Sequence, residues 1–377
     1  MKAARNILFV KYGTFSHVNA PMADALAREF PEYRLTVVDA ARDILASYPW
    51  RSLLLRLAAN LRSPVAFLRG RHSPWDFVFR EAAAWDLISR WMTRHADPEN
   101  TAFIFQTQSM FDASSPPIPS FVYTDHTREA HRRQGAGGAV APASREWIER
   151  ERALYRRADT VFTLSDFCRR SVVEDYDVAP DKVLTVSTGI NMHLPEGPVD
   201  AGARRPVILF VGGEWKVKGG PYLVEAFRLV RREVPDAELW LVGSQPARLE
   251  PGLKAHGRVD RGTLDRLYRE AAVLCVPSIL DRASMVALDA AAYGLPVVTN
   301  PFGAGAERVV DGVTGYVVDP RNPAALSSVL IRLLRDPALR RTLGSAGRDR
   351  VEKKFTWETV GAKVADRIRS VLHAEKS

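Results

Sequence analysis

The sequence VLCVPSILDRASMVALDAAAYGLPVV, residues 273–298, places a strand, a loop, a helix and a second strand in one short segment. The apolar run at 273–278 predicts a buried strand, and the apolar stretch after Ser284 predicts a buried helix. Ser284 is expected at the N-cap of this helix, and Gly294 and Pro296 are expected to end it. Buried strands that alternate with helices are typical of parallel α/β sheets.

Two aspartates stand out in this segment because one of them lies inside the apolar helix. Asp281 is in the loop, and Asp289 follows the N-cap by five residues, about 7–8 Å along the axis at roughly 1.5 Å per residue. A phosphate at the helix start would have a sugar ring on each side within that distance, and carboxylates accept hydrogen bonds from paired hydroxyls. One carboxylate is expected to bind a ribose and the other the transferred group. The alternative is a solvated Asp281 and a locally hydrogen-bonded Asp289.

The same alternation of strands and helices continues along the chain. The Pro- and Gly-containing stretch 191–206 has no period and is expected to link two domains. The sequence therefore predicts an α/β protein with two doubly wound parallel sheets that face a cleft, where the carboxyl ends of the strands bind ligands. Strands are expected at 7–10, 35–39, 102–106, 120–124, 160–165, 183–188, 207–212, 238–243, 273–278, 296–300 and 315–319.

A glycine-rich turn occurs in FVGGEWKVKGGPYLVEAF, residues 210–227. Gly212 and Gly213 allow the backbone to approach a ligand closely, and Pro221 suits the first turn of a helix. Lys218 precedes that helix, so helix amides and a lysine would together form an anion site. The alternative is an ordinary strand-to-helix turn with a surface lysine. The spacing matches neither a Walker A loop nor G-x-G-x-x-G.

Composition narrows the class of protein. The 377 residues suit roughly two domains, and 46% hydrophobic with 26% charged residues is the profile of a soluble globular protein. Cys168 and Cys275 are too few for a disulfide framework, which favours a cytoplasmic location, and no apolar run is long enough for a transmembrane helix. The net charge is +1 over residues 1–200 and +8 over the remainder. This asymmetry suits a diphosphate ligand or an acidic surface, or simply serves solubility.

Two further segments have unusual compositions. Residues 50–72, WRSLLLRLAANLRSPVAFLRGRH, contain five arginines and no acidic residue. This pattern suits either peripheral contact with the inner face of an anionic membrane or a helix with a solvated basic face. Residues 131–142, HRRQGAGGAVAP, are expected to form a loop on the acceptor side.

Several motifs together carry a family resemblance. LDRASMVALDAAAYGLPVV resembles the E-x7-E segment of the retaining glycosyltransferases of family four, and ILFVGGEWKVKGGPYLVEAF resembles their G-R-x(4)-K-G element. Three more stretches match in the same order: RGTLDRLYREAAVLCVPS, ERVVDGVTGYVVDPRNPAAL, and ERALYRRADTVFTLSDF with VLTVSTGIN. The similarity covers residues 150–377 closely and 1–149 loosely.

The resemblance implies a GT-B fold and a donor site in the C-terminal half. It implies an acceptor-binding domain at 1–195, a donor-binding domain at 205–355, and a C-terminal helix at 356–377 that packs back on the first domain. Lys218 would hold the diphosphate and Asp289 the ribose, while Asp281 would contact the donor sugar. The donor site would also use Gly212, Gly213, Lys216 and the amides of Ser284 and Met285. Glu307 suits either a helix start or a ligand.

The N-terminal half offers fewer candidates. FVYTDHT presents His126 at a strand end, and this residue resembles the family histidine near the reacting centre. A histidine there can bond a sugar hydroxyl or shape the developing charge, and the alternative is a structural histidine. Gly13, Thr14 and His17 follow the first strand and are expected near the acceptor.

The sequence departs from the family pattern in three places. Aspartates replace both glutamates and are one methylene shorter, RAS replaces G-F-G at 282–284, and Gly213 replaces the arginine of G-R. Lys216 is expected to replace the lost charge.

The expected function is retaining, metal-independent transfer of a sugar from a nucleoside-diphosphate sugar to a hydroxyl acceptor, with His126, Lys218 and Asp281 as catalytic candidates. No cofactor, metal or nucleic acid is expected. A GT-B nucleotide-sugar epimerase and a non-catalytic sugar-nucleotide binder are the alternatives. A nicotinamide-dependent enzyme is disfavoured because neither half contains G-x-G-x-x-G.

Overall fold

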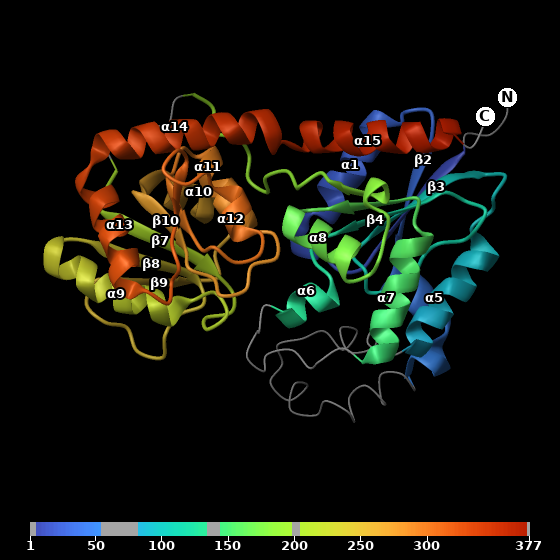
Figure 1. The fold of residues 1–377 in the computed structure, drawn as a ribbon, viewed down its shortest axis with the longest axis horizontal. Helices are drawn as coiled ribbons and strands as arrows, with labels where there is room; N and C mark the ends of the chain where they lie inside the picture. Colours follow the sequence, from blue (N-terminus) through green and yellow to red (C-terminus); the bar gives the residue numbers. More distant parts are fainter. Residues whose placement is uncertain (1–4, 54–81, 134–143, 198–203, 375–377) are drawn as a thin grey trace.

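A computed structural model describes residues 5–53, 82–133, 144–197 and 204–374, and shows two α/β domains side by side (Figure 1). The predicted segment 50–72 lies largely outside the described residues, and so does most of the predicted loop at 131–142. Within the described part of the chain, no helix is long and apolar enough to cross a membrane.

The first domain contains a six-stranded parallel sheet in the order β2-β1-β3-β4-β5-β6. Every strand lies within one or two residues of its predicted start, because the apolar β-branched runs are the segments that become buried. The sheet consists of β1 (Asn6–Lys11), β2 (Arg34–Asp39), β3 (Thr101–Thr107), β4 (Ser120–Thr124), β5 (Thr160–Thr163) and β6 (Val183–Thr185). Its helices are α1 (Asn19–Glu29), α5 (Ala82–His95), α6 (Arg128–Arg133), α7 (Arg145–Arg157) and α8 (Asp166–Glu174).

The second domain contains another six-stranded parallel sheet, in the order β12-β11-β10-β7-β8-β9. Numbered within the domain, this is the Rossmann order 3-2-1-4-5-6. The strands are β7 (Val207–Gly212), β8 (Glu238–Gly243), β9 (Leu253–Gly257), β10 (Val273–Val276), β11 (Val297–Thr299) and β12 (Gly315–Val317). The helices are α9 (Gly220–Glu233), α10 (Arg261–Glu270), α11 (Met285–Ala292), α12 (Gly305–Arg308), α13 (Pro323–Arg335) and α14 (Pro337–Lys354).

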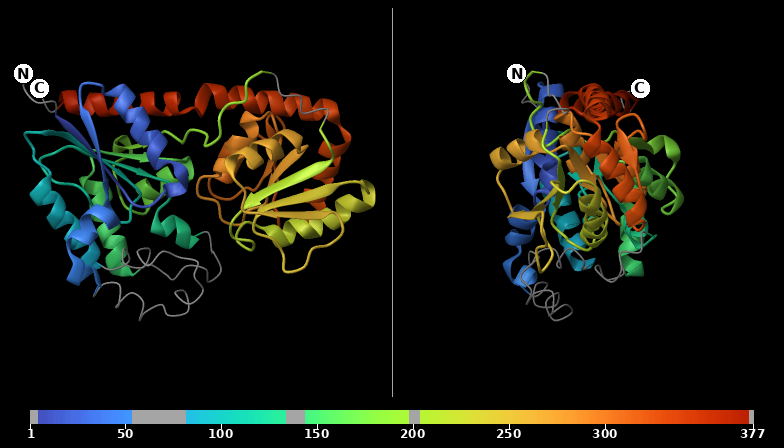
Figure 2. Two further views of the ribbon diagram at one scale, coloured as in Figure 1. Left: turned by 180° about the vertical axis from the view of Figure 1, so that it is seen from behind. Right: turned by 90° about the vertical axis from the view of Figure 1, so that its left-hand side faces the viewer.

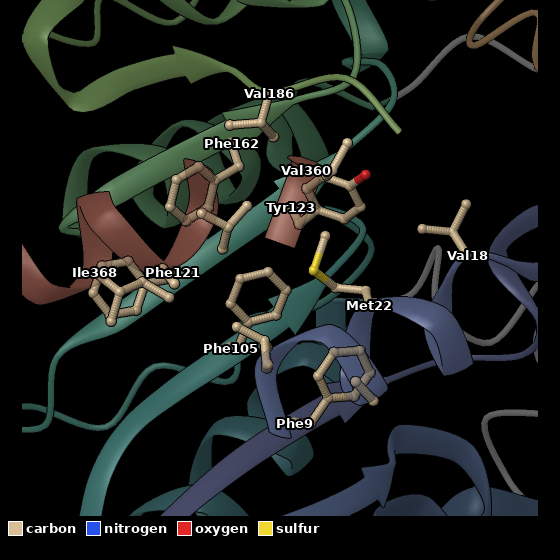
Figure 3. Close-up of a cluster of buried hydrophobic side chains, with 14 of the residues drawn as sticks. Phe9, Val18, Met22, Phe105, Phe121, Tyr123, Phe162, Val186, Val360 and Ile368 are labelled. Atoms are coloured by element: carbon tan, nitrogen blue, oxygen red, sulfur yellow. The ribbon is translucent and has the colours of Figure 1, made fainter. Parts of the chain in front are cut away.

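The C-terminal helix α15 (Trp357–Ala374) leaves the second domain and runs along the first, as the views from both sides show (Figures 1 and 2). Val360 and Ile368 of α15 pack with Phe9, Phe105 and Met22 in the core of the first domain (Figure 3). The packing with α1 is close, since a Cβ on Gly361 would lie 2.8 Å from the Cβ of Ala25. The predicted return of the C-terminal helix to the first domain is therefore confirmed.

Candidate functional site

The strand order of the second sheet determines where a site can form. The order reverses between β7 and β10, so the loops after these two strands diverge and leave a crevice at their carboxyl ends. A cavity of about 670 Å³ lies there, between the two domains. Its lining includes Gly212, Gly213, Lys218 and Asp281 from the second domain, and Asp125 and His17 from the first.

The β7–α9 turn is built around Gly219, which has φ of 75°. A Cβ at this position would lie 1.7 Å from the carbonyl oxygen of Pro277, so only glycine fits. The turn directs Lys218 into the cavity, where its Nζ lies 3.9 Å from Oδ1 of Asp281. The structure therefore brings together two predicted site residues that are 63 positions apart in the sequence.

Asp281 is buried, with only 2% of its surface exposed. Its Oδ1 accepts a hydrogen bond from the Ser284 amide at 3.0 Å, and its Oδ2 accepts one from Nδ2 of Asn300 at 3.5 Å. Asp281 thus fixes the loop that leads into α11, in addition to lining the cavity.

Ser284 occupies the predicted N-cap position, but its expected capping role is wrong. The residue is left-handed, with φ of 47°, and its hydroxyl has no hydrogen-bond partner among the described residues. Asp281 takes the amide of Ser284 instead, so this amide is not directed at a phosphate as expected. Met285 begins the helix, and first-turn amides have no intrahelical acceptor.

Asp289 has a different position from the one expected. It is buried in α11 and does not line the cavity. Its Oδ1 accepts hydrogen bonds from the amides of Asn191 at 2.7 Å and Met192 at 3.2 Å, both in the interdomain linker. Burial raises the pKa of Asp289 to about 6, although these two hydrogen bonds oppose the shift. In this arrangement Oδ1 of the carboxylate ties the linker to the second domain.

Lys216 is exposed and does not line the cavity, so the structure does not place it where the missing arginine charge is expected. Glu307 is a helix-start residue rather than a cavity residue. Its carboxylate accepts hydrogen bonds from the amides of Asp166 at 2.8 Å and Phe167 at 2.7 Å, at the start of α8 in the other domain. An anion at a helix N-terminus is favoured by the exposed amides and the helix dipole.

His126 follows the carboxyl end of β4 and is not among the residues that line the interdomain cavity. Its Nδ1 is 2.6 Å from Oδ1 of Asp125, which lines the cavity. The ring of His131 is 5.8 Å away, centroid to centroid. The Asp-His pair directly after a predicted strand is the sequence signal from which Asp125 could have been found.

A second cavity of about 640 Å³ lies beside the first domain's β1–α1 loop. Gly13, Thr14 and His17 all line it, and His17 lines the interdomain cavity as well. Asn19, which is 5% exposed, is also in the wall, and its Oδ1 has no hydrogen-bond partner among the described residues. The three predicted acceptor residues therefore share one hollow that meets the donor side at His17.

Two arginines at the cleft, Arg258 and Arg308, were not singled out from the sequence. Arg258 lines the interdomain cavity, and so does Arg282 of the RAS segment that replaces G-F-G. Arg308 is 5% exposed and crosses between the domains, donating to the carbonyls of Ala283 and Leu164 and to the hydroxyl of Ser187. No sequence signal marks Arg308, because its partners are backbone and hydroxyl groups from distant segments.

The described residues contain no group of three or more His, Cys, Asp or Glu side chains that could hold a metal ion. Cys168 and Cys275 are buried free thiols.

Comparison with known proteins identifies relatives of both halves. The family described as glycosyl transferases group 1 matches residues 205–336, and glycosyltransferase family 4 matches residues 108–194. The chain is 30% identical over 293 residues to D-inositol 3-phosphate glycosyltransferase of Frankia alni, covering 67% of this chain and 68% of that one. It is 30% identical over 240 residues to MMP alpha-(1->4)-mannosyltransferase of Mycolicibacterium hassiacum, covering 59% of this chain and 57% of the relative.

The fold is also shared with solved structures. Sucrose-phosphate synthase of Thermosynechococcus elongatus superimposes with a TM-score of 0.71 at 19% identity, over 98% of this chain and all of that one. Two Rossmann-like domains with a cavity between them, together with the matches in sequence, lead to one assignment. The chain belongs to the group 1 glycosyltransferases of family 4, and its fold is GT-B.

Proposed function

We propose that this protein transfers a sugar from a nucleoside-diphosphate sugar to a hydroxyl acceptor, with retention of anomeric configuration and without a metal ion. The observation that carries the proposal is the meeting of Lys218 and Asp281 in one cavity at the start of α11. A lysine beside a helix N-terminus favours a bound diphosphate, and a carboxylate next to it suits sugar hydroxyls.

The donor would span the cavity from the β8 and β9 ends to the first domain. Its nucleoside would lie on the side of Gly243 and Arg258, and its diphosphate between Lys218 and the first amides of α11. Asp281 would accept hydrogen bonds from the transferred sugar. Lys218 and the helix dipole would stabilise the negative charge that develops on the departing diphosphate, which is the term expected to contribute most to catalysis.

The acceptor would enter from the cavity beside Gly13, Thr14 and His17. Transfer breaks the bond between the anomeric carbon and the phosphate oxygen and forms a bond from that carbon to the acceptor oxygen on the same face. The acceptor proton passes to the leaving phosphate. His126 contacts Asp125, which lines the cavity, and would bond a sugar hydroxyl.

A donor panel tests the function directly. UDP-, GDP-, ADP- and dTDP-sugars are compared by thermal shift, and the best binder is then incubated with hydroxyl acceptors and the products identified. A raised melting temperature with one donor and a glycosylated product of retained configuration are expected. Free nucleotide formed without acceptor would indicate an epimerase. Binding without turnover on any acceptor would indicate a sugar-nucleotide-binding protein.

A further inference from the structure

Asp125 and His126 follow directly after β4, and their side chains contact each other. Nδ1 of His126 lies 2.6 Å from Oδ1 of Asp125, the residue before it. The hydroxyl of Thr124 donates to the His126 carbonyl at 3.0 Å, which fixes the backbone at this point. The side chains of Asp125 and His126 are only 13% and 22% exposed. Both side chains are therefore largely shielded from bulk water, and Asp125 lines the interdomain cavity.

The charge of Asp125 determines which ring nitrogen of His126 carries a proton. Burial alone would raise the pKa of this carboxyl, but the charges of His126 and Arg282 and the His126 hydrogen bond hold its pKa below the ordinary value. Asp125 is therefore a carboxylate, and a carboxylate can only accept hydrogen bonds. The ring nitrogen facing it must carry the proton, which leaves Nε2 of His126 for any other partner.

Two further titratable or charged residues, His131 and Arg282, lie near the Asp125–His126 pair. His131 is 8% exposed, and neither of its ring nitrogens has a hydrogen-bond partner among the described residues. Burial, and then the charges of Arg282 and His126, lower the pKa of His131 to about 4, so it is neutral near pH 7. Arg282 comes from the opposite domain and lines the same cavity as Asp125. Apart from His126, the residue that supplies positive charge to Asp125 is therefore Arg282, and not His131.

We propose that Asp125 is a positioning residue for His126. It holds the imidazole with Nδ1 protonated and leaves Nε2 for a further partner, and Arg282 supplies the balancing charge from the second domain. The role of His126 in sugar transfer rests on the proposed function, but the orientation of its ring does not. A buried carboxylate that fixes the tautomer of a neighbouring histidine is a known means of ordering a reactive imidazole.

Histidine NMR tests the orientation without any need for activity. Protein labelled with ¹⁵N-histidine is compared for wild type, Asp125→Asn and His126→Ala, the last to assign the signal. Wild-type His126 is expected to carry its proton on Nδ1 at pH 8, and Asp125→Asn is expected to shift the population toward Nε2–H. As a control, Asp177→Asn changes an exposed aspartate of the same domain, paired with Arg156, and is expected to leave the signal unchanged. An Nε2–H tautomer in the wild type would overturn the proposal.

Kinetics then test the consequence through a double-mutant cycle. Asp125→Asn is expected to lower kcat about 10-fold while leaving KM for the donor within about threefold. In the His126→Ala background, Asp125→Asn is expected to change kcat less than twofold, since Asp125 acts through His126. Equal effects in both backgrounds would overturn the positioning role. Absence of turnover in the wild type would instead contradict the proposed function, and the NMR comparison would still decide the role of Asp125.

Discussion

At the residue scale, the charge around Lys218 decides what the cavity can bind. Its ammonium lies 3.9 Å from Asp281, so the pair is close to neutral on its own. Arg258 and Arg282 add positive charge to the same wall. A diphosphate in the proposed donor site would therefore meet Lys218 beside two carboxylates that already have partners. Asp281 accepts a hydrogen bond from an amide, and Asp125 pairs with His126.

Replacement of Lys218 tests this arrangement. Lys218→Ala is expected to lower kcat at least about 100-fold, because it removes the main positive side chain at the developing charge of the leaving group. Thermal unfolding is expected to change little, since this side chain is about one third exposed. Lys353→Ala, an exposed lysine on α14, serves as the control. If the steady-state rates of Lys218→Ala and Lys353→Ala agree within threefold, the assignment of Lys218 to the diphosphate is wrong.

The buried Asp289 predicts a pH dependence of stability. Its pKa is raised to about 6 in the folded protein, against roughly 3.9 for an unfolded aspartate, so the folded state binds more protons between these values. The free energy of unfolding should therefore fall as pH rises from about 4 to 6, by up to about 3 kcal/mol. Urea unfolding at pH 4.5 and pH 7 measures the effect. Asp289→Asn keeps an oxygen for the linker amides and should reduce this pH dependence; an unchanged dependence would contradict the raised pKa.

At the element scale, the sequence predicted eleven of the strands because each contains an apolar run with at least one buried residue. It missed β9, LKAHG, whose only buried residue is Leu253 and which pairs at the edge of the sheet. The glycine turn before α9 was predictable from its residues, since only glycine fits position 219. The hydrogen bonding of the loop before α11 was not predictable. Asp281, rather than the Ser284 hydroxyl, makes the hydrogen bond there, and this choice depends on tertiary packing.

Arg308 tests how far this loop depends on the other domain. It joins Ala283 of the α11 loop to Leu164 and Ser187 of the first domain. Arg308→Met is expected to lower the free energy of unfolding by about 2–4 kcal/mol, since three buried acceptors lose their donor. Arg332→Met, at an exposed position of α13, is the control. A loss below about 1 kcal/mol in urea unfolding would show that the crossing bonds contribute little.

At the scale of the whole molecule, the chain crosses between its domains twice. The first crossing is the linker near 191–192, which Asp289 holds, and the second is the step from α14 to α15. The two crossings contact each other, since Trp357 Nε1 donates to the Ile190 carbonyl at 2.8 Å. The overall GT-B organisation was predictable from the repeated strand–helix pattern and the linker. The role of Asp289 was not, because it depends on a linker 97 residues away in sequence.

Overpacking at Gly361 tests whether α15 is an integral part of the first domain. This helix contributes Val360, Val364 and Ile368 to a core that otherwise comes mostly from the first domain. Gly361→Leu would force a side chain against Ala25, where even a Cβ would lie at 2.8 Å, and is expected to cost about 1–3 kcal/mol of stability. Lys363→Leu introduces the same side chain two positions away on the exposed face of α15 and should change stability by less than about 0.5 kcal/mol. If α15 were only a loosely docked tail, urea unfolding of the two variants would coincide. Separation of the two curves by the expected amount would mean that α15 is packed as part of the core of the first domain.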